Sequence, residues 1–224
     1  MNLGHLFAHI VTERMVELTN QSDLLLVLQL GMALFWIVVY ILIIIRGFRD
    51  KAYGMPMVAI CANISWEFIF AFIHPQNDLQ QKITMIWFAL DIVILMQYLL
   101  YGRKEFKKYL SNMLFYASFF ITLVVSFLII LTITQEFNDF EGKYTAFSQN
   151  LMMSGLFISL LFWRGNLKGQ SLAIAIFKML GTLCASIAFY VYFRTSLITI
   201  ISVAILLYDL IYMGLIYKLD RKNK

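Results

Sequence analysis

The chain has 224 residues, of which 61% are hydrophobic and only 14% are charged, and its mean hydropathy is +0.78. These values exclude an ordinary soluble domain and indicate a polytopic membrane protein, one domain spanning 1–224. The net charge of +5 does not indicate a nucleic-acid partner, because the basic residues gather in loops that alternate along the chain.

Residues 1–22 are too polar for a signal peptide, and they lack a basic start and a small-residue cleavage site. Their apolar side chains recur on one face of a helix. We therefore expect a short N-terminal helix that lies in the membrane interface.

Apolar segments of bilayer-spanning length fill the rest of the chain. The sequence predicts an all-α bundle of seven transmembrane helices, an integral multi-pass protein of a bacterial inner membrane or a eukaryotic endoplasmic reticulum. The predicted spans are 24–45, 55–73, 83–101, 110–134, 144–163, 170–193 and 197–217.

Lysine and arginine are concentrated in the connections after the first, third and fifth spans and in the C-terminal tail. The connections on the other side of the membrane carry more acidic than basic residues. The positive-inside rule then places the N-terminus outside and the C-terminus inside.

Three acidic residues lie within predicted spans: Glu67 in the second, Asp91 in the third and Asp209 in the seventh. An acid in hydrocarbon is costly and usually has a function. With a helical rise of about 1.5 Å per residue, Glu67 and Asp91 lie at similar depth, and Asp209 lies about one turn nearer the inner side.

Other polar and aromatic side chains accompany these acids, either on the same helical face or at the same depth. We regard them as candidates for a supporting role or a substrate pocket. They are Asn63, Trp66, Trp87, Gln149, Asn150, Lys178 and Tyr212.

One interpretation is that these groups are hydrogen-bonded contacts between helices. A second is that they carry chemistry, because a neutral carboxylic acid in an apolar pocket is a proton donor. Glu67 has no basic residue in its own span, whereas Asp209 stays an anion if it pairs with Lys178. This contrast favours Glu67 as the acid and Asp209 as a base or electrostatic partner.

Motifs for metal or nucleotide chemistry are absent from the sequence, which has no aspartate-rich DDxxD run, no Walker loop and no HExxH helix. Cys61 and Cys184 are isolated in apolar segments and suggest neither a disulfide framework nor a zinc site. We therefore expect no metal and no cofactor.

Taken together, a series of short motifs resembles the membrane-integral terpene cyclases of meroterpenoid and indole-diterpenoid biosynthesis. The resemblance runs from the second span to the seventh. The motifs occur in this order: Asn63-Ile64-Ser65-Trp66-Glu67, Trp87-Phe88-Ala89-Leu90-Asp91, Arg164-Gly165-Asn166-Leu167-Lys168-Gly169-Gln170-Ser171, Gly181-Thr182 and Asp209-Leu210-Ile211-Tyr212.

This resemblance implies a seven-helix, class II-like enzyme that protonates an epoxide or alkene and cyclises a lipophilic polyprenyl or prenylated substrate from the bilayer. It also implies that Glu67 and Asp209 are the essential acids and that Asp91 supports them. Lys178 stands where the family is expected to have arginine. A proton-coupled small-molecule transporter and a seven-helix scaffold or receptor remain the alternatives, because both could use the same buried acids.

Overall fold

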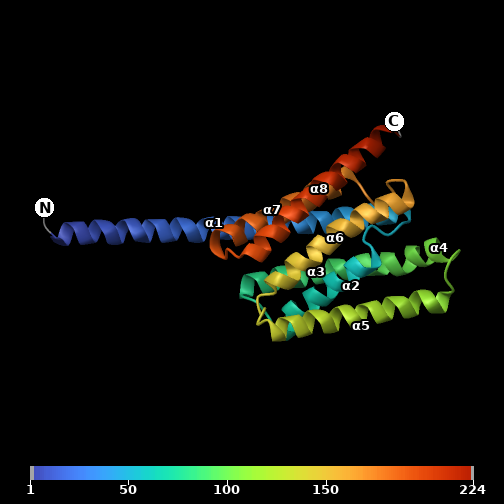
Figure 1. The fold of residues 1–224 in the computed structure, drawn as a ribbon, viewed down its shortest axis with the longest axis horizontal. Coiled ribbons are helices and arrows are strands. Elements are labelled where there is room, and N and C mark those ends of the chain that lie inside the picture. The colour runs from blue at the N-terminus through green and yellow to red at the C-terminus, as the bar shows by residue number, and fades with distance from the viewer. Residues whose placement is uncertain (1–2, 223–224) are drawn as a thin grey trace.

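The computed structural model describes residues 3–222, with side chains described over 23–221. All regular secondary structure in this part of the chain is helical, which confirms the predicted all-α class (Figure 1). The elements are α1 (Leu3–Asp50), α2 (Met57–Phe68), η1 (Ile69–Ile73), α3 (Asp78–Gln97), η2 (Tyr98–Gly102), α4 (Arg103–Phe106), α5 (Asn112–Glu136), α6 (Lys143–Arg164), α7 (Leu172–Tyr192) and α8 (Ser196–Lys222).

Each predicted span corresponds to one apolar helix or continuous pair of helices. Among the described residues, six helices are long and apolar enough to cross a membrane, and the seventh apolar helix, Met57–Ile73, is shorter. The chain is therefore an integral, multi-pass membrane protein. The predicted orientation of its two ends stays a prediction.

The N-terminal segment differs from the predicted separate helix. Residues 3–22 are helical but continue without a break into the first span as part of the 48-residue α1. Figure 1 shows α1 projecting well beyond the rest of the bundle. The predicted apolar face of residues 1–22 lies outside the described side chains.

The helices form a closed ring with α5 on its outside. Helix α1 packs against α3 and α7, α8 packs against α6 and α7, and α2 packs against α3, α5 and α6. Fully buried aliphatic side chains such as Ile43, Ile60 and Ile174 fill the spaces between these helices. The ring encloses the polar side chains that the sequence places at membrane depth.

A polar cluster joins three connections at the end of the bundle predicted to face inward. Arg164 forms two hydrogen bonds to the Glu105 carboxylate, at 2.8 and 2.7 Å, and a third to the Tyr53 carbonyl at 2.8 Å. Its guanidinium carbon lies 4.1 Å from the centre of the Tyr53 ring. Burial raises the pKa of Tyr53 to about 12, so this phenol is neutral at ordinary pH. The Asp50 carboxylate accepts a hydrogen bond from the Gly169 N–H at 3.0 Å.

Replacing Gly169 by alanine should destabilise this cluster. Gly169 has a φ of +73°, and an added Cβ would lie 2.5 Å from the Tyr53 carbonyl oxygen. Strain of this kind costs about 1–3 kcal/mol, so we expect a lower melting temperature in detergent. Gly155→Ala on α6 is the matched control, because nothing lies within 4 Å of its added Cβ. Equal melting temperatures for the two variants would contradict this account.

Candidate functional site

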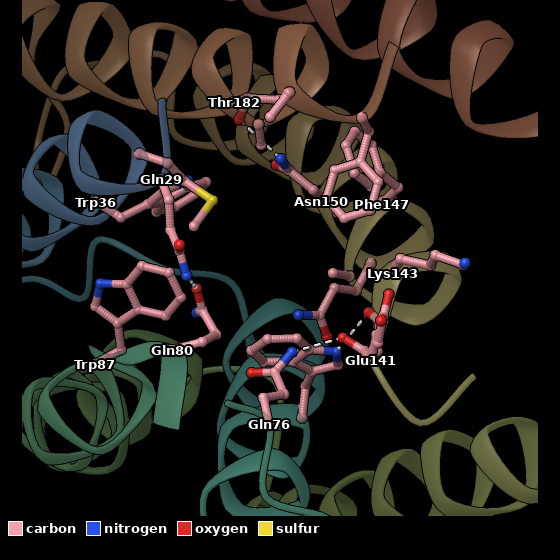
Figure 2. A pocket seen from close by; sticks show the side chains of 18 of the residues that line it. Gln29, Trp36, Gln76, Gln80, Trp87, Glu141, Lys143, Phe147, Asn150 and Thr182 are labelled. Carbon is pink, nitrogen blue, oxygen red and sulfur yellow. Dashed lines mark hydrogen bonds between the residues drawn. The ribbon is translucent and has the colours of Figure 1, made fainter. Parts of the chain in front are cut away.

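A central cavity of about 370 Å³ lies between α1, α2, α3, α6 and α7 (Figure 2). Six of the side chains proposed from the sequence line it, and they come from three of these helices. They are Asn63, Trp66, Glu67, Trp87, Gln149 and Asn150.

One end of the cavity is polar. Figure 2 shows Gln29, Gln76, Gln80, Glu141 and Lys143 around it, contributed by α1 and by the starts of α3 and α6 with their preceding loops. Gln29 Nε2 donates a hydrogen bond to Gln80 Oε1 at 3.0 Å. Apolar and aromatic side chains form much of the remaining wall. A ligand with a polar head and an apolar tail matches this arrangement.

Glu67 belongs to a buried cluster on the cavity wall. Asn63 Nδ2 lies 3.1 Å from Glu67 Oε1 and 2.7 Å from Asp91 Oδ2, so one amide donates to both carboxyl groups. Tyr40 donates its hydroxyl proton to Glu67 Oε1 at 2.9 Å, and its oxygen also lies within hydrogen-bond distance of Asn63 Nδ2. Gln149 Nε2 reaches Asn63 Oδ1 from α6 at 3.3 Å.

Local helix geometry explains the position of Glu67. It lies one turn after Asn63 on the same face of α2, in the last turn before the π-helical segment η1. Such π-helical turns are frequent at functional sites. The neighbouring Trp66 points elsewhere, and its indole N–H donates to the Gly142 carbonyl at 3.1 Å and to Thr145 Oγ1 at 3.2 Å.

The acid cluster contains more hydrogen-bond acceptors than the protein satisfies. Glu67 Oε2 and Asp91 Oδ1 are buried and have no hydrogen-bond partner. Within the described part of the chain, no lysine or arginine forms an ion pair with either carboxyl. Asp91 itself does not line the cavity but lies behind Asn63.

Asp209 forms a separate cluster with Lys178 and Ser154. Lys178 Nζ lies 2.7 Å from both Asp209 Oδ1 and Ser154 Oγ, and Ser154 Oγ donates to Asp209 Oδ1 at 2.9 Å. Both members of the ion pair are only 1% exposed. The ion pair between Lys178 and Asp209, which the sequence suggested, is therefore present, and it joins α7 to α8.

The two essential acids implied by the family resemblance do not share one cavity. Asp209 lines a second cavity of about 270 Å³ between α7 and α8, and Thr182 contributes to both cavities. Lys178, Asp91 and Tyr212, which were candidates for a supporting role or a substrate pocket, line neither of these two cavities. Tyr212 instead packs against Phe157, with ring centres 5.6 Å apart.

Two polar side chains in these clusters were missed by the sequence analysis. Tyr40 contacts Glu67, and Ser154 bridges Lys178 and Asp209. Tyr40 has a hydroxyl near the middle of an apolar span, and Ser154 lies four residues after Asn150 on α6. Both signals were available in the sequence, but tyrosine and serine are also common as packing residues in membrane helices.

The fold and this site define a multi-pass helical membrane protein with a partly polar cavity beside an unpaired buried acid. A family model described as Pyr4-like transmembrane terpene cyclases matches residues 15–222. The chain belongs to this family.

Curated relatives are similar over part of their length. The chain is 30% identical over 159 residues to "Pyr4-family terpene cyclase mfmH" of Annulohypoxylon moriforme, covering 69% of this chain and 65% of the relative. It is 28% identical over 160 residues to "Terpene cyclase macJ" of Penicillium terrestre, covering 69% and 62%. It is 28% identical over 159 residues to "Asnovolin H synthase nvfL" of Aspergillus novofumigatus (strain IBT 16806), covering 69% and 65%. The matches thus span slightly less than two thirds of these relatives.

Proposed function

We propose that this chain is a terpene cyclase that binds a prenylated substrate in the central cavity and starts cyclisation by proton transfer from Glu67. The observation that carries the proposal is the Glu67 carboxyl on the wall of a largely apolar cavity, buried and without an ion-pair partner among the described residues. Membership of the terpene cyclase family supports the same conclusion.

The arrangement of the two acids favours a protonated, neutral form of one carboxyl group. Two buried carboxyl groups that share the Asn63 amide repel each other when both are ionised, so one of them is better neutral. Of the two, Glu67 lines the cavity. After Glu67 gives up its proton, the hydrogen bonds from Tyr40 and Asn63 to Oε1 stabilise the remaining carboxylate.

The proton balance of the reaction is simple. Glu67 protonates an epoxide oxygen, breaking a C–O bond, or a terminal alkene carbon, and either step leaves a tertiary carbocation. Internal alkenes attack in turn, each forming a C–C bond, and the last cation loses a proton to water to leave an alkene. Glu67 takes up one proton from water before the next turnover, so the reaction consumes and releases no net proton. Substrate and product are therefore isomers, and initiation requires no metal ion because a side chain is the proton donor.

The shape and lining of the cavity orient the substrate. The polar end, with Gln29 and Gln80, suits a head group that carries hydroxyl or carbonyl groups. The prenyl chain then extends into the apolar part, with its far end toward Glu67. Trp36, Trp66 and Trp87 also line the cavity, and an aromatic ring that presents its face to the substrate stabilises positive charge.

Asp209 acts in this proposal as a fixed electrostatic partner. It forms an ion pair with Lys178 at 2.7 Å and lies outside the central cavity. It therefore acts on the central cavity from a distance, and its hydrogen bonds to Ser154 on α6 and Lys178 on α7 hold it in place.

Product analysis tests the proposal directly. Membranes from an expressing host are incubated with prenylated phenols and with their terminal epoxides, beside membranes from the same host carrying an empty vector. We expect cyclised products with the same mass as the substrate. If every substrate is recovered unchanged while vesicles show proton flux coupled to solute uptake, the chain is a transporter and the proposal is wrong.

A further inference from the structure

A series of hydrogen bonds between side chains runs along the polar end of the central cavity, from α1 to the loop before α6. Gln29 Nε2 donates to Gln80 Oε1 at 3.0 Å, and Gln80 Nε2 lies 3.3 Å from Thr84 Oγ1. Thr84 Oγ1 lies 3.5 Å from Gln76 Oε1, and Gln76 Nε2 donates to the backbone carbonyl of Glu141. Figure 2 shows both ends of this series, with Gln29 beside Gln80 and Gln76 beside Glu141.

The Glu141 carbonyl fixes the direction of every hydrogen bond in the series, because a backbone carbonyl can only accept. It holds the Gln76 amide with its nitrogen toward Glu141, so Gln76 Oε1 faces Thr84 and needs a donor. The Thr84 hydroxyl has one proton, and when it donates that proton to Gln76, its oxygen is left to accept from Gln80 Nε2. Gln80 Oε1 is then the acceptor that faces Gln29, so Gln29 presents its nitrogen to Gln80.

The Gln29 side-chain oxygen is the acceptor that this order leaves without a partner. Among the described residues, no donor forms a hydrogen bond to Gln29 Oε1. Gln29 lines the cavity and is half-buried, and its oxygen is not one of the buried side-chain atoms that lack a partner. The oxygen is therefore accessible, and a ligand in the cavity with an O–H or N–H group matches it.

We infer that Gln29 Oε1 accepts a hydrogen bond from an O–H or N–H group on the substrate head, an inference that rests on the proposed cyclase function. A head with a carbonyl or ether oxygen in this place would set two acceptors against each other. The Gln29 amide cannot offer its nitrogen instead without reversing the roles along the series, and the Glu141 carbonyl does not allow this. The site therefore selects heads that donate, because an unpaired polar group costs more than a lost contact.

Competition between four substrates tests this selection. Each carries the same prenyl tail on a benzene ring, and the four differ in one ring substituent, which is a hydroxyl group, an amino group, a methoxy group or a hydrogen atom. Membranes from an expressing host receive equimolar mixtures, so the ratio of product rates gives the ratio of kcat/KM. We expect the hydroxyl and amino probes to exceed the methoxy and unsubstituted probes by about tenfold or more.

Gln29→Met removes the acceptor and keeps the approximate length of the side chain. We expect the preference for the donating probes to disappear, because methionine offers the head group no strong acceptor. Leu30→Met is the matched control, because Leu30 is the next residue on α1 and is 47% exposed. The control should keep the wild-type preference.

Thr84 provides a test that direct contact with the substrate cannot explain. Its side chain is fully buried and does not line the central cavity. Thr84→Val has the shape of threonine without its hydroxyl, so the Gln80 and Gln29 amides become free to turn. We expect the preference for donating probes to fall about threefold or more, whereas Thr84→Ser, which has a hydroxyl, should keep it. This pair also decides the role of Gln29 if Gln29→Met fails to fold, which size-exclusion chromatography in detergent would show.

The outcomes separate this inference from the proposed function. Wild-type membranes that cyclise none of these probes and no other prenylated substrate overturn the cyclase proposal itself. Similar kcat/KM values for all four probes, or a folded Gln29→Met protein that keeps the preference, leave the cyclase proposal intact and overturn the role of Gln29. A Thr84→Val protein with the full wild-type preference overturns the fixed direction of the hydrogen bonds.

Discussion

Glu67→Gln is expected to lower the formation of cyclised product by at least about a hundredfold, with the protein still inserted and folded. Glutamine has the size of glutamate, and its carbonyl oxygen can keep the hydrogen bond from Tyr40. It has no acidic proton to give, so the cascade does not start. The measurement is the initial rate of product formation by membranes with matched protein content.

Asp91→Asn is the matched comparison for this variant. Asp91 accepts from the same Asn63 amide but lies behind it, outside the central cavity. We therefore expect a much smaller loss of rate than for Glu67→Gln. A Glu67→Gln protein that cyclises near the wild-type rate, or an Asp91→Asn protein that is the more damaged, would rule out Glu67 as the proton donor.

The Glu67 cluster shows what helix periodicity can predict. Asn63 and Glu67 are four residues apart, so a helix must place them on one face. The rise per residue also places Asp91 at a similar depth, and both carboxyl groups do contact Asn63.

Depth alone does not give the rotation of a helix about its axis, and this limits the prediction for Asp209. The cavity that Asp209 lines, between α7 and α8, depends on how α8 packs against α6 and α7. Those contacts are between residues far apart in the chain. The sequence therefore predicts that Asp209 lies about one turn nearer the inner side than Glu67, but it does not predict that Asp209 lines a different cavity.

The N-terminal helix shows a second limit of prediction from the sequence, which concerns where a helix ends. The polar residues before Asp23 suggested an interruption between two helices, but a polar segment without proline or glycine is able to continue an α-helix. Helix α1 continues through this segment from Leu3 to Asp50. Hydropathy predicts where the apolar span begins, but it does not predict whether the helix ends there.

Asp209→Asn is expected to destabilise the protein by about 3–5 kcal/mol and to abolish cyclisation. The change leaves the Lys178 ammonium buried with only neutral partners, such as the Ser154 hydroxyl and the new amide oxygen, among the contacts described. An uncompensated buried charge is costly, so the melting temperature in detergent should fall. Lys178→Met should show a similar loss of stability, because it leaves the Asp209 carboxylate without its cation.

Combining the two substitutions separates stability from catalysis. The double variant Lys178→Met/Asp209→Asn contains neither buried charge, so we expect it to regain most of the stability that each single variant loses. If Asp209 contributes an anion to cyclisation, the double variant will be stable but inactive. Recovery of activity together with stability would show instead that the ion pair only holds α7 and α8 together. Because Asp209 lies outside the central cavity, this double-mutant cycle distinguishes an electrostatic role in catalysis from a structural one more directly than either single substitution.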